Sequence, residues 1–285
     1  MSGKKTVFVT GCSAGGIGFA LAKEFHSQGC RVFATSRRLD SMEALSALEI
    51  ETLELDVTDI DAIRRVKTEI STRTGGKLDI LVNNAGQTIS GAASDVDMSD
   101  VRAMFELNLF APMSIVQEFL PLLIAAGKAT VVNTGSVASV IPTPFLSSYN
   151  ATKAALRSFG NTLRIELAPF NIRVVDLMTG KVTSNVMKPY SIPDGSLYKS
   201  IEPEYQKNVQ VRDDAMSAED YARIVVAEAV KAKPRATLWA GTAAAVTWFV
   251  VTFLPDSVMS SALAKMFGFS KLAAQVKSAA DKKHV

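Results

Sequence analysis

Short apolar runs alternate with longer helical patterns along most of this 285-residue chain. The runs, rich in Val, Ile and Leu, span residues 6–10, 31–35, 52–54, 80–83, 130–134, 173–178 and 237–240. The helical patterns lie between them, near 17–29, 59–74, 99–125, 150–168 and 217–232. Strands that alternate with helices predict parallel βαβ units. Because the runs are continuously apolar, both faces of the sheet should be covered. We therefore predict a single α/β domain with a doubly wound parallel sheet.

The composition permits a sizeable core and argues against several classes of protein. Hydrophobic residues make up 48% and charged residues 21% of the chain, which are ordinary globular values. The net charge of +3 is too small to indicate a nucleic-acid partner. Two cysteines, Cys12 and Cys30, without a Cys/His cluster predict neither a disulfide framework nor a metal site. The apolar run 6–10 is too short for a signal peptide, so we expect a reducing, cytoplasmic location.

A glycine-rich turn follows the first predicted strand. Residues 10–18 read Thr-Gly-Cys-Ser-Ala-Gly-Gly-Ile-Gly and lead directly into a helical pattern. Backbone N–H groups and the helix dipole at such a turn favour an anion, and a pyrophosphate in particular. Glycines are needed there because a Cβ atom would block close approach. Taken alone, the same pattern also fits an ordinary tight turn between a strand and a helix.

The end of the second predicted strand indicates which nicotinamide cofactor binds. A cofactor with a free ribose 2′-hydroxyl usually meets an Asp or Glu at this position, whereas a 2′-phosphate meets an Arg. Here Ser36 is followed by Arg37 and Arg38, and the first carboxylate is Asp40. A guanidinium binds phosphate through two hydrogen bonds. We therefore predict NADP(H), with Arg37 as the main contact, against the alternative that both arginines are merely solvated.

Tyr149 and Lys153 form a chemical unit if they lie on a helix. Residues four apart share one helix face, so both side chains would reach the same cleft. The ordinary pKa of a tyrosine, about 10, is too high for ready deprotonation at neutral pH. A nearby ammonium group stabilises the phenolate and lowers that pKa. The spacing therefore predicts an acid–base pair, although the pattern by itself also occurs on ordinary helix surfaces.

These segments resemble the short-chain dehydrogenase/reductase family. The glycine loop is similar to the family's TGxxxGxG pattern with one residue inserted, which leaves open whether Gly15 or Gly16 takes the middle position. Leu55-Asp56-Val57 follows the third predicted strand, where the family has an Asp–Val pair against the adenine. Asn83-Asn84-Ala85-Gly86 resembles its NNAG segment after the fourth strand.

The resemblance extends to a complete catalytic set. Ser136 lies just after the fifth predicted strand and thirteen residues before Tyr149, where the family has its catalytic serine. Asn108 matches the catalytic asparagine, although Ala111 replaces the usual glycine of that motif. After the sixth strand, Thr179 replaces the family's proline. The resemblance covers roughly residues 4–242 and implies a Rossmann-type fold.

The family's mechanism assigns a role to each residue of this set. It implies that Ser136 binds the substrate oxygen, that Tyr149 exchanges a proton with it, and that Asn108 holds a water molecule. Lys153 would bind the nicotinamide ribose and lower the pKa of Tyr149. The cofactor would be bound by Gly11, Ser13, Gly16, Ile17, Gly18, Ser36, Arg37, Asp56, Val57, Asn83, Ala85, Tyr149, Lys153, Val182 and Ser184. The implied activity is reversible reduction of a ketone.

Residues 1–242 should form the cofactor-binding and catalytic domain, with a substrate lid at about 184–212. The lid contains three prolines and no clear period, and loops this long are usually functional. It combines apolar residues with bases, namely Val186, Met187, Tyr190 and Leu197 with Lys188, Lys199, Lys207 and Arg212. Such a wall suits a bulky or acyl-bearing ketone, and a lysine could receive a phosphate or carboxylate.

Residues 243–285 form an apolar C-terminal extension. No charged side chain occurs in 236–255, which approaches the ~20 residues of a membrane span. Because this stretch begins with a predicted core strand, the remainder is too short to span. We expect it to lie on a membrane surface, to cover the substrate pocket, or to be a packed tail or oligomer contact.

The motifs within the family are most similar to those of 1-acyldihydroxyacetone-phosphate reductases. Reductases of polyketide or terpenoid ketones have the same motifs, so these motifs do not distinguish between the two substrate classes. An isomerase or cyclase that retains NADP(H), or a silent scaffold, is the alternative from another class, and the intact catalytic set argues against both. We expect a small-molecule partner and a homo-oligomer, either dimer or tetramer.

Overall fold

The computed structural model describes residues 4–185, 190–210 and 214–282. Seven strands form one parallel sheet in the order β3-β2-β1-β4-β5-β6-β7. The strands are β1 (Thr6–Thr10), β2 (Arg31–Ser36), β3 (Glu51–Glu54), β4 (Ile80–Asn83), β5 (Ala129–Thr134), β6 (Ile172–Thr179) and β7 (Thr237–Ala240). The predicted fold class is confirmed, and the order reverses between β1 and β4, where ligands bind at the carboxyl ends of such sheets.

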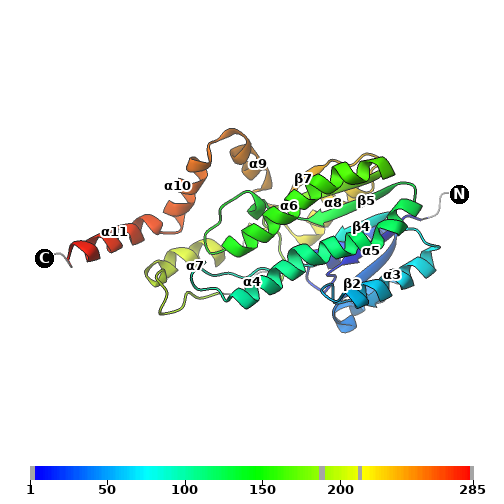
Figure 1. Ribbon diagram of the computed structural model, residues 1–285, viewed down its shortest axis with the longest axis horizontal. Coiled ribbons are helices and arrows are strands. Elements are labelled where there is room, and N and C mark those ends of the chain that lie inside the picture. The colour runs from blue at the N-terminus through cyan, green and yellow to red at the C-terminus, as the bar shows by residue number, and fades with distance from the viewer. Residues whose placement is uncertain (1–3, 186–189, 211–213, 283–285) are drawn as a thin grey trace.

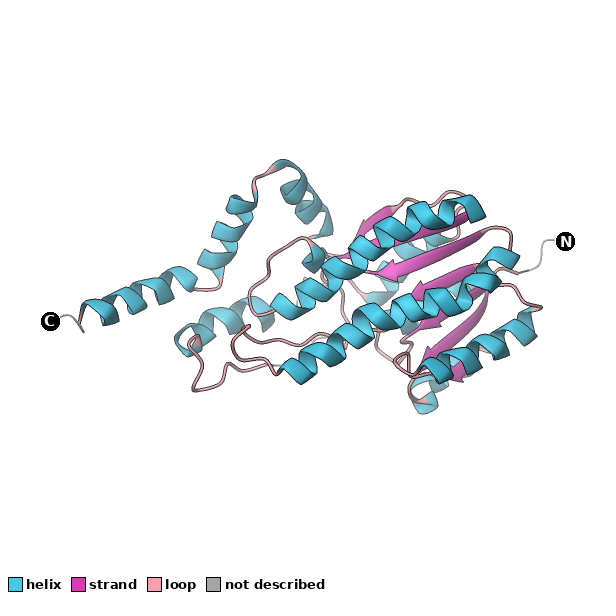
Figure 2. Ribbon diagram, in the orientation of Figure 1, coloured by secondary structure: helices cyan, strands magenta, loops and turns pink. Residues whose placement is uncertain are grey.

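Helices cover both faces of the sheet (Figures 1 and 2). One face packs against α1 (Ile17–Ser27), α2 (Glu43–Ser46) and α8 (Ala218–Ala229), and the other against α3 (Ile60–Thr74), α5 (Ala111–Ala125) and α6 (Ser147–Leu167). Side chains of β1 alternate between the two cores, because successive residues of a strand point to opposite faces. Val7 and Val9 join the first core, and Phe8 stacks on Phe119 in the second.

Local sequence signals fix where several of these helices begin and end. Asp59 caps α3 by accepting hydrogen bonds from the backbone N–H groups of Asp61 and Ala62, and Ser217 caps α8 in the same way. Such caps satisfy N–H groups that have no partner in the first helical turn. Gly75 ends α3 in the left-handed conformation, which glycine adopts without strain. Short 3₁₀ turns cover Leu39–Met42, Val137–Ser139, Ala168–Phe170 and Lys199–Ile201.

The helix that was predicted at 99–125 contains a π turn. It consists of α4 (Met98–Phe105), the π turn Glu106–Phe110, and α5. Within the described residues this is the one helix long and apolar enough to cross a membrane, with a mean hydropathy of 1.5 in its most apolar window. One face of this helix, which includes Ile115 and Leu123, is buried against the sheet, whereas Phe110 and Ile124 are exposed. Core packing therefore accounts for its composition.

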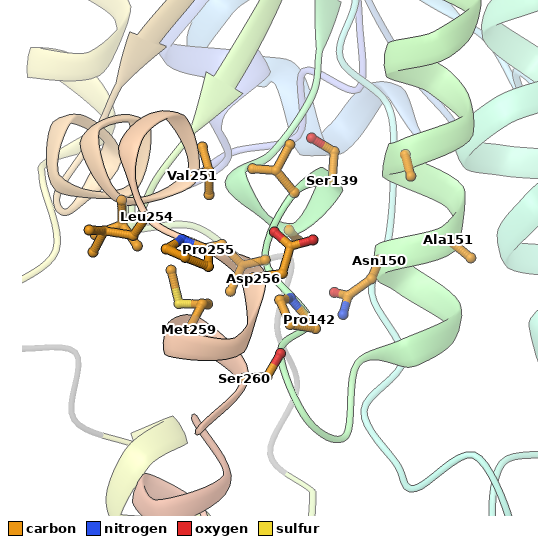
Figure 3. Close-up of a pocket in the computed structure, with 15 residues that line it drawn as sticks. Ser139, Pro142, Asn150, Ala151, Val251, Leu254, Pro255, Asp256, Met259 and Ser260 are labelled. Carbon is orange, nitrogen blue, oxygen red and sulfur yellow. The ribbon is translucent and has the colours of Figure 1, made fainter. Parts of the chain in front are cut away.

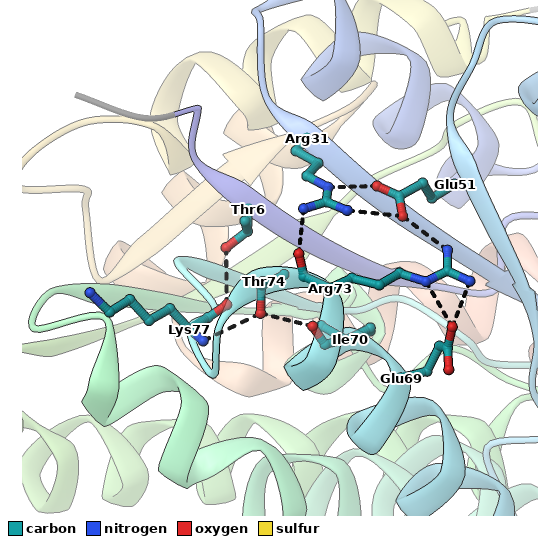
Figure 4. Close-up of polar contacts among 8 residues, drawn as sticks. All are labelled: Thr6, Arg31, Glu51, Glu69, Ile70, Arg73, Thr74 and Lys77. Atoms are coloured by element: carbon teal, nitrogen blue, oxygen red, sulfur yellow. Dashed lines mark hydrogen bonds and ion pairs between the residues drawn. The ribbon is translucent and has the colours of Figure 1, made fainter. Parts of the chain in front are cut away.

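A polar network joins β2, β3 and α3 at the end of the sheet opposite the glycine loop (Figure 4). Glu51 lies between two arginines, at 2.6 Å from Arg31 and 2.9 Å from Arg73. Arg73 also pairs with Glu69 one helical turn before it, and Arg31 donates to the Arg73 carbonyl at 2.7 Å. These arginines hold the pKa of Glu51 below its usual value although partial burial opposes them. The network attaches the edge strand β3 to α3.

A row of buried polar side chains crosses the centre of the sheet. Asn83, Asn133 and Asp176 occupy one register line of β4, β5 and β6, and hydrogen bonds of 3.0 and 3.1 Å link them in that order. Arg164 of α6 forms an ion pair with Asp176 at 2.5 Å. Gly160 leaves room for this carboxylate, because a Cβ there would overlap Asp176. The row therefore fixes the position of α6, the helix that carries Tyr149 and Lys153, on the sheet.

The lid contains more regular structure than its sequence suggested. It includes the helix α7 (Glu202–Gln210), and the C-terminal extension forms α9 (Ala244–Phe253), α10 (Asp256–Met266) and α11 (Phe269–Asp281). Propensity failed to identify α7 because Pro203 lies in its sequence; proline is tolerated there, in the first helical turn. Figure 1 shows α10 and α11 as an arm that extends away from the sheet.

Candidate active site

The glycine loop lies at the carboxyl end of β1, beside the switch between β1 and β4. Gly11 has a φ of 72°, and a Cβ there would lie 2.8 Å from the Cα of Ala85. A Cβ on Gly18 would overlap the Gly11 carbonyl and the Asn84 amide. Gly15 takes a left-handed φ of 74°, whereas Gly16 is the N-cap of α1. The inserted residue is therefore absorbed by dividing the turn between these two glycines. This loop fits a pyrophosphate for two reasons. The glycines leave space that a Cβ atom would fill, and the free backbone N–H groups of the first turn of α1 lie beside that space.

Asn84 and Asn185 brace this loop, and the sequence analysis assigned a role to neither. The Asn84 amide donates to the carbonyls of Thr10 at 2.9 Å and Gly11 at 3.2 Å. Asn185, in the segment after β6, donates to the Ala14 carbonyl at 3.0 Å. Asn84 could have been found from the NNAG segment. No local signal pairs Asn185 with a loop 171 residues away.

Three serine hydroxyls cluster at the end of β2. Ser36 lies 2.8 Å from Ser13 and 2.9 Å from Ser41, and Ser41 lies 3.3 Å from Ser13. Arg37 and Arg38 are exposed beside them. Arg38 pairs with Asp40 at 3.2 Å, whereas Arg37 has no ion pair among the described residues. A group of hydroxyls beside a free guanidinium fits a 2′-phosphate. Ser41 is the member that the strand-end pattern did not predict.

The remaining cofactor residues also lie at this edge. Asp56 accepts hydrogen bonds from the N–H and hydroxyl of Thr58, and Val57 is buried in the core beside it. Val182 and Met216 form an isolated parallel bridge. Its hydrogen bonds involve the backbone of Lys181 and Thr183, so the N–H and carbonyl of Val182 itself take no part in the bridge. Ser184 is half-buried.

Ser136 and Tyr149 approach each other from two elements. Ser136 follows β5 and caps the 3₁₀ turn Val137–Ser139, because its hydroxyl accepts the Ala138 N–H at 3.1 Å. Tyr149 lies in the first turn of α6. Burial raises the pKa of Tyr149, and a hydrogen bond with Ser136 partly opposes this. The phenol is therefore protonated at neutral pH, which is the form that can donate a proton to a ketone oxygen.

Lys153 is buried one helical turn after Tyr149. Its side chain is 5% exposed, and its ammonium group donates to the Thr134 carbonyl at 2.9 Å and lies 5.8 Å from the centre of the Tyr149 ring. Burial lowers the pKa of Lys153 to about 8. No carboxylate pairs with it among the described residues, and a buried ammonium without such a partner readily loses its proton.

Asn108 holds the loop that follows β4. It lies in the π turn, and such turns occur frequently at functional sites. Its amide accepts from the Gln87 N–H at 2.9 Å and donates to the Gln87 carbonyl at 2.8 Å and to Thr152 at 3.1 Å. A Cβ on Gly86 would lie 3.1 Å from Asn108 and 3.7 Å from Lys153, so both side chains flank this glycine. A water-binding role for Asn108 stays a prediction.

The lid and the C-terminal arm meet in one aromatic cluster. Phe145, in the loop before α6, packs edge-on against Tyr198 and Tyr205 of the lid. It also contacts Phe267 and Phe269 of the arm at a tilted angle. Its φ of 62° is unusual for a bulky residue, and its carbonyl accepts from the Gly91 N–H at 2.8 Å. The two segments are therefore attached to the domain at the same point.

One of the lid bases predicted to receive an anion, Lys199, is already paired with carboxylates. Lys199 pairs with Asp194 at 2.9 Å and Glu202 at 2.7 Å, so its charge is already neutralised within the lid. Lys207 is exposed. Val186, Met187, Lys188 and Arg212, which the same expectation included, lie outside the described residues.

Comparisons with known proteins agree with this architecture. Residues 5–193 match the family model for short-chain dehydrogenases. A short-chain dehydrogenase of Neurospora crassa is 39% identical over 94% of this chain and 93% of its own length. The NADPH-dependent 1-acyldihydroxyacetone phosphate reductase of Schizosaccharomyces pombe is 43% identical over 70% of this chain and 69% of its own. A solved short-chain dehydrogenase from Streptomyces avermitilis superposes with a TM-score of 0.79 at 28% identity, covering 96% of this chain and 99% of that one.

Proposed function

The chain belongs to the short-chain dehydrogenase/reductase family and is an oxidoreductase, and from that premise we propose that it reduces a ketone with NADPH, using Tyr149 as the proton donor. The observation that carries the proposal is the buried Lys153 ammonium beside Tyr149 and Ser136, at the carboxyl edge of the sheet. The cofactor, when bound, supplies the hydride.

The residues of this chain perform the remaining steps. Ser136 hydrogen-bonds the ketone oxygen and orients it toward Tyr149. The Tyr149 hydroxyl donates its proton as negative charge develops on that oxygen, and the product is a secondary alcohol. Charged Lys153 stabilises the phenolate that remains. A proton from solvent then restores Tyr149, and the same steps in reverse oxidise the alcohol.

NADPH preference and a bulky substrate form the finer part of the proposal. The three serines beside Arg37 support NADPH, as does the 43% identity to a reductase whose name specifies NADPH and an acylated, phosphorylated ketone. The aromatic cluster of lid and arm supports an apolar substrate such as 1-acyldihydroxyacetone phosphate. A polyketide or terpenoid ketone remains the alternative.

NADPH absorbance in the presence of a panel of ketones tests this function. We expect oxidation of NADPH with at least one large ketone. An isomerase or cyclase would convert substrate without changing absorbance.

Tyr149→Phe should lower kcat by at least ~100-fold because the ring still packs but no proton is available, while NADPH binding persists. Lys153→Ala should weaken both. If the Phe variant kept about a tenth of the wild-type kcat, Tyr149 would not be the donor.

We also propose that α9 contacts a lipid surface. This helix has no charged residue, and Trp248, Phe249 and Phe253 are 45, 54 and 61% exposed. Helices that are apolar all round are normally buried in protein or lipid. Lys265, Lys277 and Lys282, which lack ion pairs among the described residues, would face anionic headgroups.

Buried free thiols at Cys12 and Cys30 support a cytoplasmic location. A dimer or tetramer remains our expectation, which light scattering measures.

A further inference from the structure

A groove separates the C-terminal arm from the outer flank of α6 (Figure 3). Its volume is about 470 Å³, which is within the usual range for small-molecule sites. One wall is formed by the segment 138–142 together with Ala151 and Ala154 of α6. The other is formed by the end of α9 and the start of α10, including Val251 and Leu254. Tyr149 and Lys153 do not line it, so the groove is distinct from the catalytic site.

Two hydrogen-bond acceptors in this groove lack donors. The Asn150 side chain donates through its nitrogen to the Thr143 carbonyl at 3.1 Å, which fixes its orientation. Its oxygen is buried and has no hydrogen-bond partner. Figure 3 shows the Asp256 carboxylate between the two walls, and this carboxylate has no side-chain partner among the described residues. The buried Asn150 oxygen is unfavourable by about 1–3 kcal/mol without a donor, so a ligand that donates to it would be stabilised. The Asp256 carboxylate is exposed and contributes a negative charge at the rim of the groove.

Among the described residues, the two wall hydroxyls, of Ser139 and Ser260, are not hydrogen-bonded to these two groups. The hydroxyl of Ser139 donates to the Ser136 carbonyl at 2.7 Å. The other wall residues are mostly apolar, among them Val140, Ile141 and Met259. The groove therefore combines an apolar surface with unpaired acceptors and a negative charge.

We propose that this groove binds an apolar chain that ends in a hydrogen-bond donor, either a hydroxyl or an ammonium group. The chain would lie along the apolar walls, and its end group would donate to the Asn150 oxygen and to Asp256. A carboxylate brings no donor at neutral pH and is repelled by Asp256. The proposal does not depend on the proposed reductase activity.

Calorimetric titration with three decyl amphiphiles, each below its micelle concentration, tests the site. Without cofactor or ketone, decan-1-ol and decylammonium should bind, and decanoate should not. Asn150→Leu should weaken decan-1-ol about fivefold, because one neutral hydrogen bond is lost. Asp256→Asn should weaken decylammonium more than decan-1-ol. Ala154→Phe should abolish binding by filling the groove.

Matched controls separate this site from the exposed face of α9. Phe249→Ser removes an exposed aromatic ring of the same helix that does not line the groove, and it should leave binding unchanged. Each variant must retain the wild-type circular dichroism spectrum and NADPH affinity. Tyr149→Phe should bind the amphiphiles normally, so that failure of the reductase proposal leaves this one standing.

Four outcomes would overturn the inference. Equal binding of decanoate and decan-1-ol would indicate unspecific partitioning, and binding that survives Ala154→Phe would place the ligand elsewhere. An Ala154→Phe variant that changed the molecular mass in light scattering would instead make the groove a contact between copies of this chain. Absence of binding by either donor amphiphile would equally refute it.

Discussion

Lys153 is a charged residue whose burial should be visible in the stability of the free protein. Its pKa falls from 10.5 to about 8 on folding. Below pH 8 the lysine is protonated in both states, and the folded state bears the cost of a buried charge. Between pH 8 and 10.5 the unfolded chain binds more protons, so stability rises with pH in this interval.

Between pH 7 and pH 10.5 the unfolding free energy of the wild type should therefore rise by about 3 kcal/mol relative to that of Lys153→Met. Urea unfolding of both proteins without cofactor measures it, and subtraction cancels the other titrating groups. A difference that stays flat across this range would mean that the folded lysine titrates normally.

We expect single residues at and just after the end of β2 to decide the choice of cofactor. Arg37→Ala should weaken NADPH by about 1.5–3 kcal/mol and leave NADH almost unchanged, because one charge-assisted phosphate contact is lost. Ser41→Asp should reverse the preference, since its carboxylate would repel the 2′-phosphate. Arg38→Ala is the matched control, because Arg38 already pairs with Asp40. Equal kcat/KM for NADPH and NADH in the wild type would contradict the assignment.

Among the elements, the lid and the C-terminal arm share one aromatic ring, Phe145, besides their direct contacts such as the ion pair between Glu204 and Lys271. Phe145→Ala should destabilise their shared cluster by about 3–5 kcal/mol, and the lid and arm should become sensitive to proteolysis together. NADPH should still bind, because the aromatic cluster does not include the glycine loop, and any loss of affinity would report on the Asn185 contact between the lid and that loop. The control is Phe253→Ala, on an exposed face of α9. Cleavage of only one of the two segments in the Phe145 variant would show that they are attached independently.

At the scale of the whole molecule, the exposed face of α9 should determine lipid binding. Truncation after Gly241 cannot test this, because it also removes Leu263 and Phe267, which are buried against the lid. We expect Phe249→Ser combined with Phe253→Ser to abolish co-sedimentation with phosphatidylcholine–phosphatidylserine vesicles and to preserve activity on a small ketone. Ile165→Ser, at a 76% exposed apolar residue of α6, is the control. If both proteins sediment like the wild type, α9 is not the contact.

Local sequence patterns were sufficient to predict the strands, the main helices and the positions of the catalytic and phosphate-loop motifs. All seven strands lie within one residue of their predicted ends. In the five inner strands, burial on both faces leaves a nearly continuous apolar run that is visible locally, whereas the edge strands β3 and β7 are only partly buried. Glycine turns and the Tyr149–Lys153 spacing are likewise properties of short segments.

Only the tertiary structure decided which distant residues meet. Ser41 reaches Ser13, Asn185 reaches the glycine loop, and Phe145 joins the lid to the arm. It also showed that Lys199 is neutralised within the lid. Such contacts arise from packing between elements that are far apart in the chain, so the residues adjacent to a side chain in sequence do not predict them. Periodicity records which face of an element is buried, but not the partner that buries it.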